Sequence, residues 1–450
     1  MTERTGGNPG VLTRIIRGLI DARADEVAAL AWSWLYFFSV LSAYYVIRPI
    51  RDDMGVAGGV ENLPWLFTGT LAGMLIANPP FAALVARLPR RKFVSISYRF
   101  FMANLVVFFI LLHGTSGAQN VWVGRLFFIW TAVFNMFVVS IFWSVLTDVF
   151  TTDQGKRLFG FIGAGGTLGA VTGSALTTGL VGYLGPVNLL LVSVVLLEIA
   201  VFSVRRLALL SDSSSRASRA ASSQETPIGG GVLSGISHAI RSPYFLNITL
   251  YMLLFTILTT FLYFHQAELV DRNFTDRAAR TAFFAQIDLL VNSVTLLTQL
   301  FLTGRMVKVL GVPVTLTFLP ALTLVGFIAL GIIPSIALLM AFQVLRRAGN
   351  FAIARPTREV LFTVVSREDK YKAKAFIDTF IYRAGDQVGA WSYGLMGLVG
   401  LGIGGISVVA VVLSMVSIVN ALWLGRKQEL MAASPMPDMP LPLRAEARRA

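Results

Sequence analysis

The segment that decides the fold runs from Ser335 to Val365 and reads SIALLMAFQVLRRAGNFAIARPTREVLFTVV. It is long enough to cross a membrane, since a spanning helix needs about 20 mostly apolar residues. A charge at the bilayer centre costs about 2.5–3.5 kcal/mol even on the most lenient scale, so intramembrane charges face a bundle interior or a water-filled cavity. We therefore expect this segment and its continuation to Gly400 to line a polar route, marked by Arg346, Arg347, Arg355, Arg358, Glu359, Asp378, Arg383 and Asp386.

The composition of the chain is that of a polytopic membrane protein. Hydrophobic residues make up 55% of the 450 residues and charged residues only 14%, against about 25% charged in a typical soluble domain. Cysteine is absent and only three histidines occur, which excludes disulfides and thiolate chemistry and indicates no metal or other cofactor. No nucleophile–base pair is apparent, so we do not expect an enzyme.

The net charge of +14 would suit nucleic acid, but in a membrane protein it more often records basic cytoplasmic loops. We therefore expect membrane lipid and a small molecule as partners, without nucleic acid, and a monomer. Most Lys and Arg residues fall in segments that alternate onto one side, and only Arg51, Arg272, Arg277 and Arg280 fall on the other. This bias predicts a multi-pass protein of the bacterial inner membrane with both termini in the cytoplasm.

The apolar runs predict an all-α membrane protein with twelve transmembrane helices. The predicted domains are a cytoplasmic tail (1–27), an N-terminal six-helix bundle (28–207), a Ser-rich and Gly-rich cytoplasmic linker (208–243), a C-terminal six-helix bundle (244–424) and a cytoplasmic tail (425–450). The helices are expected at 28–50, 63–85, 93–113, 121–147, 157–181, 187–207, 244–269, 281–303, 312–332, 335–365, 374–400 and 403–424.

A weak internal repeat relates the two bundles, because Tyr36 matches Tyr251 and Asn135 matches Asn350 at a constant separation. Parallel six-helix halves with a binding site between them near the membrane midplane are the architecture of major facilitator transporters. The loop from Ala83 to Lys92 resembles that superfamily's signature after its second helix, although Ala86 stands where the family usually has aspartate.

Three further motifs resemble the bacterial ATP/ADP carrier-like branch of nucleotide transporters: YYVIRPIRD at 44–52, WSVLTD at 143–148, and GKRLFG at 155–160 followed by GAGG at 163–166. The similarity extends over nearly the whole chain. It implies an ATP:ADP antiporter or the exchange of a related organic phosphate.

Two copies of an Arg-Pro-x-Arg pattern stand out, at 48–51 and at 355–358. Arginines three apart share a helix face and can bind a phosphate or carboxylate, and proline can kink the helix. Counting along the helices places the two pairs near opposite membrane faces, which suits gates. Alternatively, Arg48 and Arg51 extend to the headgroups together with Asp52 and Asp53.

On a regular helix Arg347, Arg355 and Arg358 would share one stripe, and Arg355 could form a purely structural salt bridge with Glu359. Arg383 can pair with Asp386 or Gln387. We expect the ligand to contact Arg48, Asn135, Arg346, Arg347, Asn350, Arg383 and Gln387. We expect gating or ion coupling from Arg51, Asp148, Asp288, Arg355, Arg358, Glu359, Asp378 and Asp386.

Protons are a second candidate partner, because a buried carboxylate tends to titrate at raised pH. Asp288 with Asn292, and His265 with Glu268, have the required residue types, although we interpret His265 as an interfacial residue. The glycine run from Gly160 to Gly173 lacks the preceding strand of a phosphate-binding loop, and we expect a helix-packing surface.

These patterns together favour a secondary active transporter that moves an anionic small molecule by alternating access. The alternatives are a proton-coupled transporter of another organic anion or drug, and a membrane scaffold without transport activity.

Overall fold

The computed structural model describes residues 23, 26–87, 90–218, 242–301, 303–365, 374 and 376–433. In these residues the regular structure is helical and contains no strand. The chain divides into two compact units, and each is described separately. Unit 1 comprises Met1–Glu225 with Val270–Asn292, and unit 2 comprises Thr226–Leu269 with Ser293–Ala450. The expected tails at 1–22 and 434–450 and the linker portion at 219–241 lie outside the described residues.

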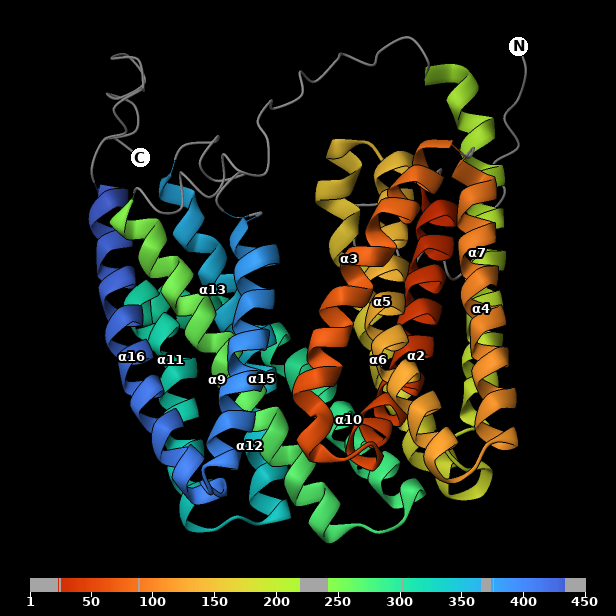
Figure 1. Ribbon diagram of the computed structural model, residues 1–450. Helices are drawn as coiled ribbons and strands as arrows, with labels where there is room; N and C mark the ends of the chain where they lie inside the picture. Colours follow the sequence, from red (N-terminus) through yellow and green to blue (C-terminus); the bar gives the residue numbers. More distant parts are fainter. Residues whose placement is uncertain are drawn as a thin grey trace, which may run out of the picture. The chain divides into compact units, whose positions relative to one another are not determined.

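Unit 1 is built around helix α2. This helix contacts α5, α6 and α7 (Figure 1), and its inward side chains, among them Tyr36, Val40 and Ile47, have 0% exposure. The helices of unit 1 are α2 (Val27–Ala57), η1 (Val60–Asn62), α3 (Leu63–Arg87), α4 (Arg90–Gly114), α5 (Gly117–Val149), α6 (Thr152–Leu184) and α7 (Leu189–Ser218), with the first part of α10 (Arg277–Phe301).

Glycines allow α6 to lie directly against α2. A Cβ atom on Gly169 would lie 2.3 Å from the carbonyl oxygen of Phe38, and one on Gly173 would lie 2.4 Å from that of Ser42. The Ser42 hydroxyl uses this approach to donate a hydrogen bond to the Gly169 carbonyl at 3.0 Å. The expected packing surface is therefore present at these positions, whereas a Cβ on Gly163 would meet nothing within 4 Å. Small residues permit close helix approach in membranes.

Unit 2 contains the arginine-rich segment from Ser335 to Val365. Its elements are α9 (Pro243–Asn273), α11 (Thr303–Ile332), α12 (Ile336–Gly349), η2 (Asn350–Ala354), α13 (Arg355–Val360), η3 (Leu361–Val364), η4 (Ile377–Ile381), α15 (Tyr382–Leu398) and α16 (Ile403–Ala433). Helix α11 lies along α16 (Figure 1) and is kinked at Gly311, whose φ of 73° suits glycine.

The segment expected as one regular helix at 335–365 is interrupted. A π-helical turn, η2, follows α12, and a second one, η4, precedes α15. A π turn inserts one residue and so rotates everything beyond it by about 100° around the axis. The predicted common stripe of Arg347, Arg355 and Arg358 stays a prediction: Arg355 is exposed, whereas Arg347 and Arg358 are partly buried.

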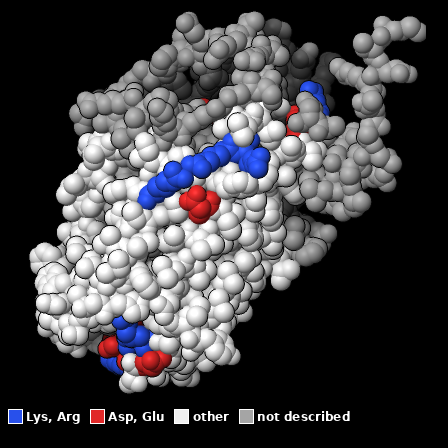
Figure 2. Space-filling view, turned by 90° about the vertical axis from the view of Figure 1, so that its right-hand side faces the viewer, with Lys and Arg blue, Asp and Glu red and all other residues white. Residues whose placement is uncertain are grey.

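Nine helices in the described part of the chain are long and apolar enough to cross a membrane. The predicted twelve spans stay a prediction. Helices α4 and α7 carry exposed apolar residues, among them Phe100, Ile110, Val195 and Phe202. The face shown in Figure 2 is largely uncharged, with Lys, Arg, Asp and Glu gathered in a few places. Such an apolar surface suits contact with lipid.

Candidate functional site

Arg346 is a buried cation that no carboxylate compensates among the described residues. It lies on α12 and is 2% exposed. Its Nε donates to the Thr323 hydroxyl at 3.0 Å, and its Nη2 donates to the Thr259 hydroxyl at 3.0 Å and to the Phe255 carbonyl at 3.3 Å. The guanidinium also lies over the Phe255 ring, 5.4 Å from its centroid. We call Arg346 with Phe255, Thr259 and Thr323 the Arg346 site.

Other predicted site arginines gather near the Arg346 site. The hydroxyl of Tyr382, at the start of α15, lies near the Asp386 carboxylate and also near Arg346, Arg355 and Arg383. The Arg383 guanidinium lies over the Tyr382 ring at 5.7 Å. Residues distant in sequence therefore place several cations around one phenol. This arrangement can bind an anion, because guanidinium groups present paired N–H donors to a carboxylate or phosphate.

Three carboxylates of unit 2 each form an ion pair with an arginine or a lysine. Arg358 Nη2 lies 3.3 Å from Asp378 Oδ1, and Arg383 Nη1 lies 3.2 Å from Asp386 Oδ2. The expected pairing of Arg383 with Asp386 is therefore confirmed. Glu359, in contrast, pairs with Lys374. The expected partner Arg355, one turn before Glu359 on α13, is exposed and forms no ion pair with any described residue, and Lys374 engages the Glu359 carboxylate instead.

Unit 1 holds a second set of charges, and Arg48 and Asp288 form its central pair. Arg48 Nη1 lies 3.0 Å from Asp288 Oδ1, and Asp288 is 2% exposed. Arg51 donates to Asp52 at 3.2 Å, and its guanidinium lies 3.8 Å from the centroid of the Phe128 ring. Asp52 and Asp53 are 5% and 0% exposed, so the alternative in which they extend to the headgroups is wrong.

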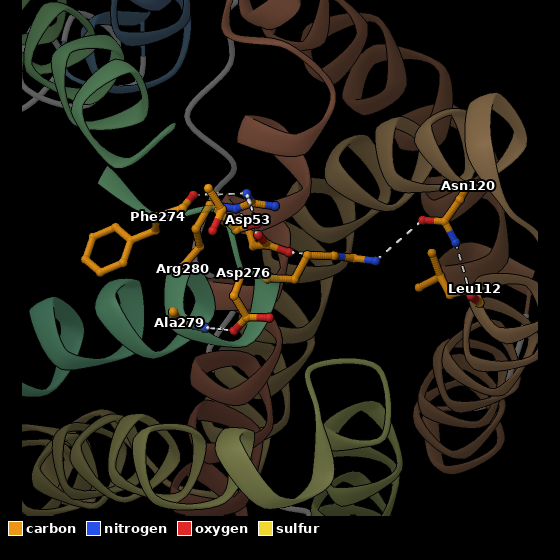
Figure 3. A network of polar contacts seen from close by, with 9 residues as sticks. Asp53, Leu112, Asn120, Phe274, Asp276, Ala279 and Arg280 are labelled. Atoms are coloured by element: carbon orange, nitrogen blue, oxygen red, sulfur yellow. Dashed lines mark hydrogen bonds and ion pairs between the residues drawn. The ribbon is translucent and has the colours of Figure 1, made fainter. Parts of the chain in front are cut away.

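Asp53 is a buried carboxylate that two arginines engage. Its Oδ2 lies 3.1 Å from Arg277 Nε and its Oδ1 lies 2.7 Å from Arg280 Nε. Figure 3 shows the network around this carboxylate. Arg280 Nη1 also donates to the carbonyls of Phe274 and Thr275, at 3.3 and 3.4 Å.

The network extends to two further helices. Arg277 Nη1 donates to Asn120 Oδ1 at 3.5 Å, and the Asn120 amide donates to the Leu112 carbonyl at 3.1 Å (Figure 3). We call Asp53, Arg277 and Arg280 the Asp53 cluster. It fixes the start of α10 to α2 within unit 1.

The Asp53 cluster was not predicted from the sequence. Arg277 and Arg280 were expected in an outer loop before a helix at 281–303, whereas α10 begins at Arg277. The missed signal is Asp276, whose carboxylate accepts the N–H of Ala279 at 2.8 Å. An aspartate three residues before such a donor marks a helix start, and two arginines at i and i+3 then share one face.

The remaining predicted residues occupy varied positions. Asn135 is half-buried on α5, Asp148 is exposed near the end of that helix, Asn350 begins η2, and Arg347 and Gln387 are half-buried. The described residues include no group of three or more His, Asp or Glu that could hold a metal ion.

The fold and these buried charges define a polytopic membrane protein with polar interiors in both units. A family model described as Major Facilitator Superfamily matches residues 27–292. The chain belongs to this superfamily, and it is a secondary transporter of that type. A search of curated proteins found no match.

Solved structures of transporters share the fold. A bacterial homologue of the human lysosomal transporter Spinster has 14% sequence identity and a TM-score of 0.60, covering 92% of this chain and 100% of that chain. A bacterial homologue of the iron transporter ferroportin has 14% identity and a TM-score of 0.61, covering 90% and 98%. The nucleoside transporter NupG has 13% identity and a TM-score of 0.55, covering 92% and 100%.

Proposed function

We propose that the chain transports an organic anion across the bacterial inner membrane by alternating access, with both termini in the cytoplasm. The observation that carries this proposal is the Arg346 site. A buried charge is normally paired, because leaving it without a counter-charge is costly. Neutral hydroxyl and carbonyl oxygens position the Arg346 guanidinium, and no described carboxylate neutralises it.

An anionic cargo would supply the missing charge. The guanidinium has five N–H donors, and the described residues accept hydrogen bonds only from Nε and Nη2. Nη1 is therefore available to a carboxylate or phosphate oxygen. Arg355, which lies near the same phenol and forms no ion pair with any described residue, would add a second point of attraction.

Exchange of ATP for ADP is the specific form that the sequence resemblance implies. Proton-coupled transport of another organic anion or drug is the second candidate function. The buried His265 supports it, because an imidazole can bind a proton. We regard the chain as a carrier and not as an enzyme or a scaffold.

The direct test is counterflow in proteoliposomes. Vesicles with purified protein are loaded with unlabelled ADP, and uptake of labelled ADP is followed. We expect uptake that depends on internal ADP and falls strongly in Arg346→Met. Arg99→Met is the matched control, because Arg99 and its partner Glu198 are both about half exposed.

A thermal-shift screen with other organic phosphates and carboxylates distinguishes a wrong cargo from a wrong binding site. Stabilisation by another anion, lost in Arg346→Met, would correct the cargo and keep the site. Absence of any Arg346-dependent anion effect would remove the anion-carrier proposal.

A further inference from the structure

His265 is a buried imidazole that the Arg346 site does not use. It lies on α9 and has 0% exposure, so the expectation of an interfacial residue is wrong. Its Nδ1 lies 2.9 Å from the Tyr393 hydroxyl on α15, and its Nε2 lies 3.0 Å from the Ser407 hydroxyl on α16. Both ring nitrogens are thus engaged by groups that can donate or accept a hydrogen bond.

A carboxylate lies one hydroxyl away from this imidazole. The Tyr393 hydroxyl donates to Oε2 of the half-buried Glu268 at 3.0 Å. Two aromatic rings pack edge-on against the imidazole. The centroids of the His265 and Phe327 (α11) rings are 5.8 Å apart, and those of the His265 and Tyr393 rings are 5.4 Å apart. All these residues belong to unit 2.

The network can hold an additional proton without losing a hydrogen bond. With His265 neutral, Tyr393 donates to Glu268, Nδ1–H donates to the Tyr393 oxygen, and the Ser407 hydroxyl donates to Nε2. When a proton binds to Nε2, the Ser407 hydroxyl rotates and accepts from Nε2–H, while the other two bonds remain. The cation then lies one phenol away from the Glu268 carboxylate, which favours the charged form.

A histidine with a purely structural role needs only one of these two arrangements. In this network the Ser407 hydroxyl can either donate or accept a hydrogen bond, and the nearby Glu268 carboxylate offsets the charge of the protonated imidazole. We propose that Glu268, Tyr393 and His265 form a proton-binding site, through which unit 2 takes up and releases one proton during transport.

His265 contacts the Tyr393 hydroxyl from α15, which connects it to Glu268 of its own helix, the uncharged Ser407 hydroxyl and the Ile403 backbone from α16, and the Phe327 ring from α11. Burial in an apolar surrounding opposes protonation of an imidazole, whereas the carboxylate favours it. The proposal therefore predicts that proton binding depends on Glu268 and on the phenol that connects it to the ring. The inference rests on the transporter class alone and needs no particular cargo.

The test is ¹⁵N NMR of histidine-labelled protein in detergent, because ¹⁵N shifts distinguish the two neutral tautomers from imidazolium. The chain has three histidines, so the variant H113N/H238N leaves His265 as the single signal. If that variant does not fold, the wild-type signals are assigned with the two single variants. We expect neutral Nδ1–H at high pH and conversion to imidazolium within the range pH 4–9.

The variants Tyr393→Phe and Glu268→Gln should each lower the midpoint of this titration by one pH unit or more. Tyr183→Phe and Glu61→Gln are matched controls, because Tyr183 is 89% exposed and Glu61 is exposed. A His265 signal that stays neutral from pH 4 to 9, or a midpoint that neither variant moves, would overturn the proposal. Neither result bears on the cargo, so this test and the counterflow test fail independently.

Discussion

The Asp53 cluster and the Arg346 site are two solutions to the burial of a charge. Asp53 is 0% exposed and is held by two arginines. Arg346 is 2% exposed and is held by two threonine hydroxyls and one carbonyl. The buried carboxylate of the first region has counter-charges, whereas the buried guanidinium of the second region has none among the described residues. The first arrangement suits a fixed contact between helices, and the second suits a site that receives its counter-charge from a ligand.

The comparison predicts its largest effect on stability at Asp53. In Asp53→Asn the carboxylate is lost while the buried guanidinium of Arg280 remains, and breaking a buried ion pair from one side costs about 3–5 kcal/mol. We expect a comparable loss in the free energy of unfolding, measured by thermal or denaturant unfolding in detergent micelles. Glu61→Gln, at an exposed carboxylate of the same unit, is the control and should change little. Equal effects at both positions would show that the Asp53 cluster is not a stabilising contact.

Arg346 should respond in the opposite direction. A buried charge without a counter-charge is costly, and replacing it with an apolar residue of similar volume removes that cost. We therefore expect Arg346→Met to unfold at the same or a higher temperature. ADP counterflow should fall about 30-fold or more, as expected when about 2 kcal/mol of charge-assisted binding is lost.

The matched control for this change is Arg358→Met. Arg358 is paired with Asp378, so its removal leaves a carboxylate without that partner and should destabilise the protein. Destabilisation by Arg346→Met of the same size as by Arg358→Met would mean that Arg346 also has a structural partner, and the contrast between the two regions would disappear.

A finer comparison lies within the Asp53 cluster. The Arg280 side chain is 9% exposed and bonds Asp53 and two carbonyls, whereas the Arg277 side chain is 33% exposed. Lysine keeps the charge but cannot reproduce the planar fork of donors. Arg280→Lys should therefore cost about 1–3 kcal/mol, the range for buried polar groups left unsatisfied, and Arg277→Lys should cost less. Unfolding of the two variants side by side decides the order, and a larger loss at Arg277 would contradict it.

The two regions differ in how far the sequence predicts them. The apolar runs indicated most helices, and their charged residues marked Arg346 as a ligand contact. The sequence predicted both Arg346 and Arg347 as ligand contacts and could not distinguish them. Arg346 is buried and Arg347 is half-buried, and only the packing of α12 determines which of the two side chains points inward.

Long-range pairing and local irregularity explain the rest. Asp53 bonds residues more than two hundred positions away, and no local pattern identifies such a partner. The π turns η2 and η4 have no reliable sequence signal, because they depend on tertiary packing. Glu359 pairs with Lys374, fifteen residues further along the chain, and the helical spacing that suggested Arg355 could not identify this partner.

The smallest expected effect on stability concerns a carboxylate outside the spanning helices. Glu26 precedes α2 and accepts hydrogen bonds from Gln154 at 2.9 Å and from Arg157 at 2.9 Å. Burial raises the pKa of Glu26, but the hydrogen bonds from the Arg23 backbone N–H, Gln154 and Arg157 outweigh it, so the pKa is lowered from 4.5.

A carboxyl whose pKa is lower in the folded state contributes stability above its unfolded pKa and loses that contribution as the pH falls through the folded value. Glu26 should therefore stabilise unit 1 at pH 7, by about 1 kcal/mol, and lose this effect only below about pH 4.5. The measurement is the unfolding temperature of the wild type and Glu26→Gln from pH 7 to pH 3, a range that continues well below 4.5. We expect the two curves to converge at the acid end. Curves that stay parallel would show that the loss in Glu26→Gln does not come from the carboxylate charge, and the contrast between compensated and uncompensated charges would then not extend beyond the membrane helices.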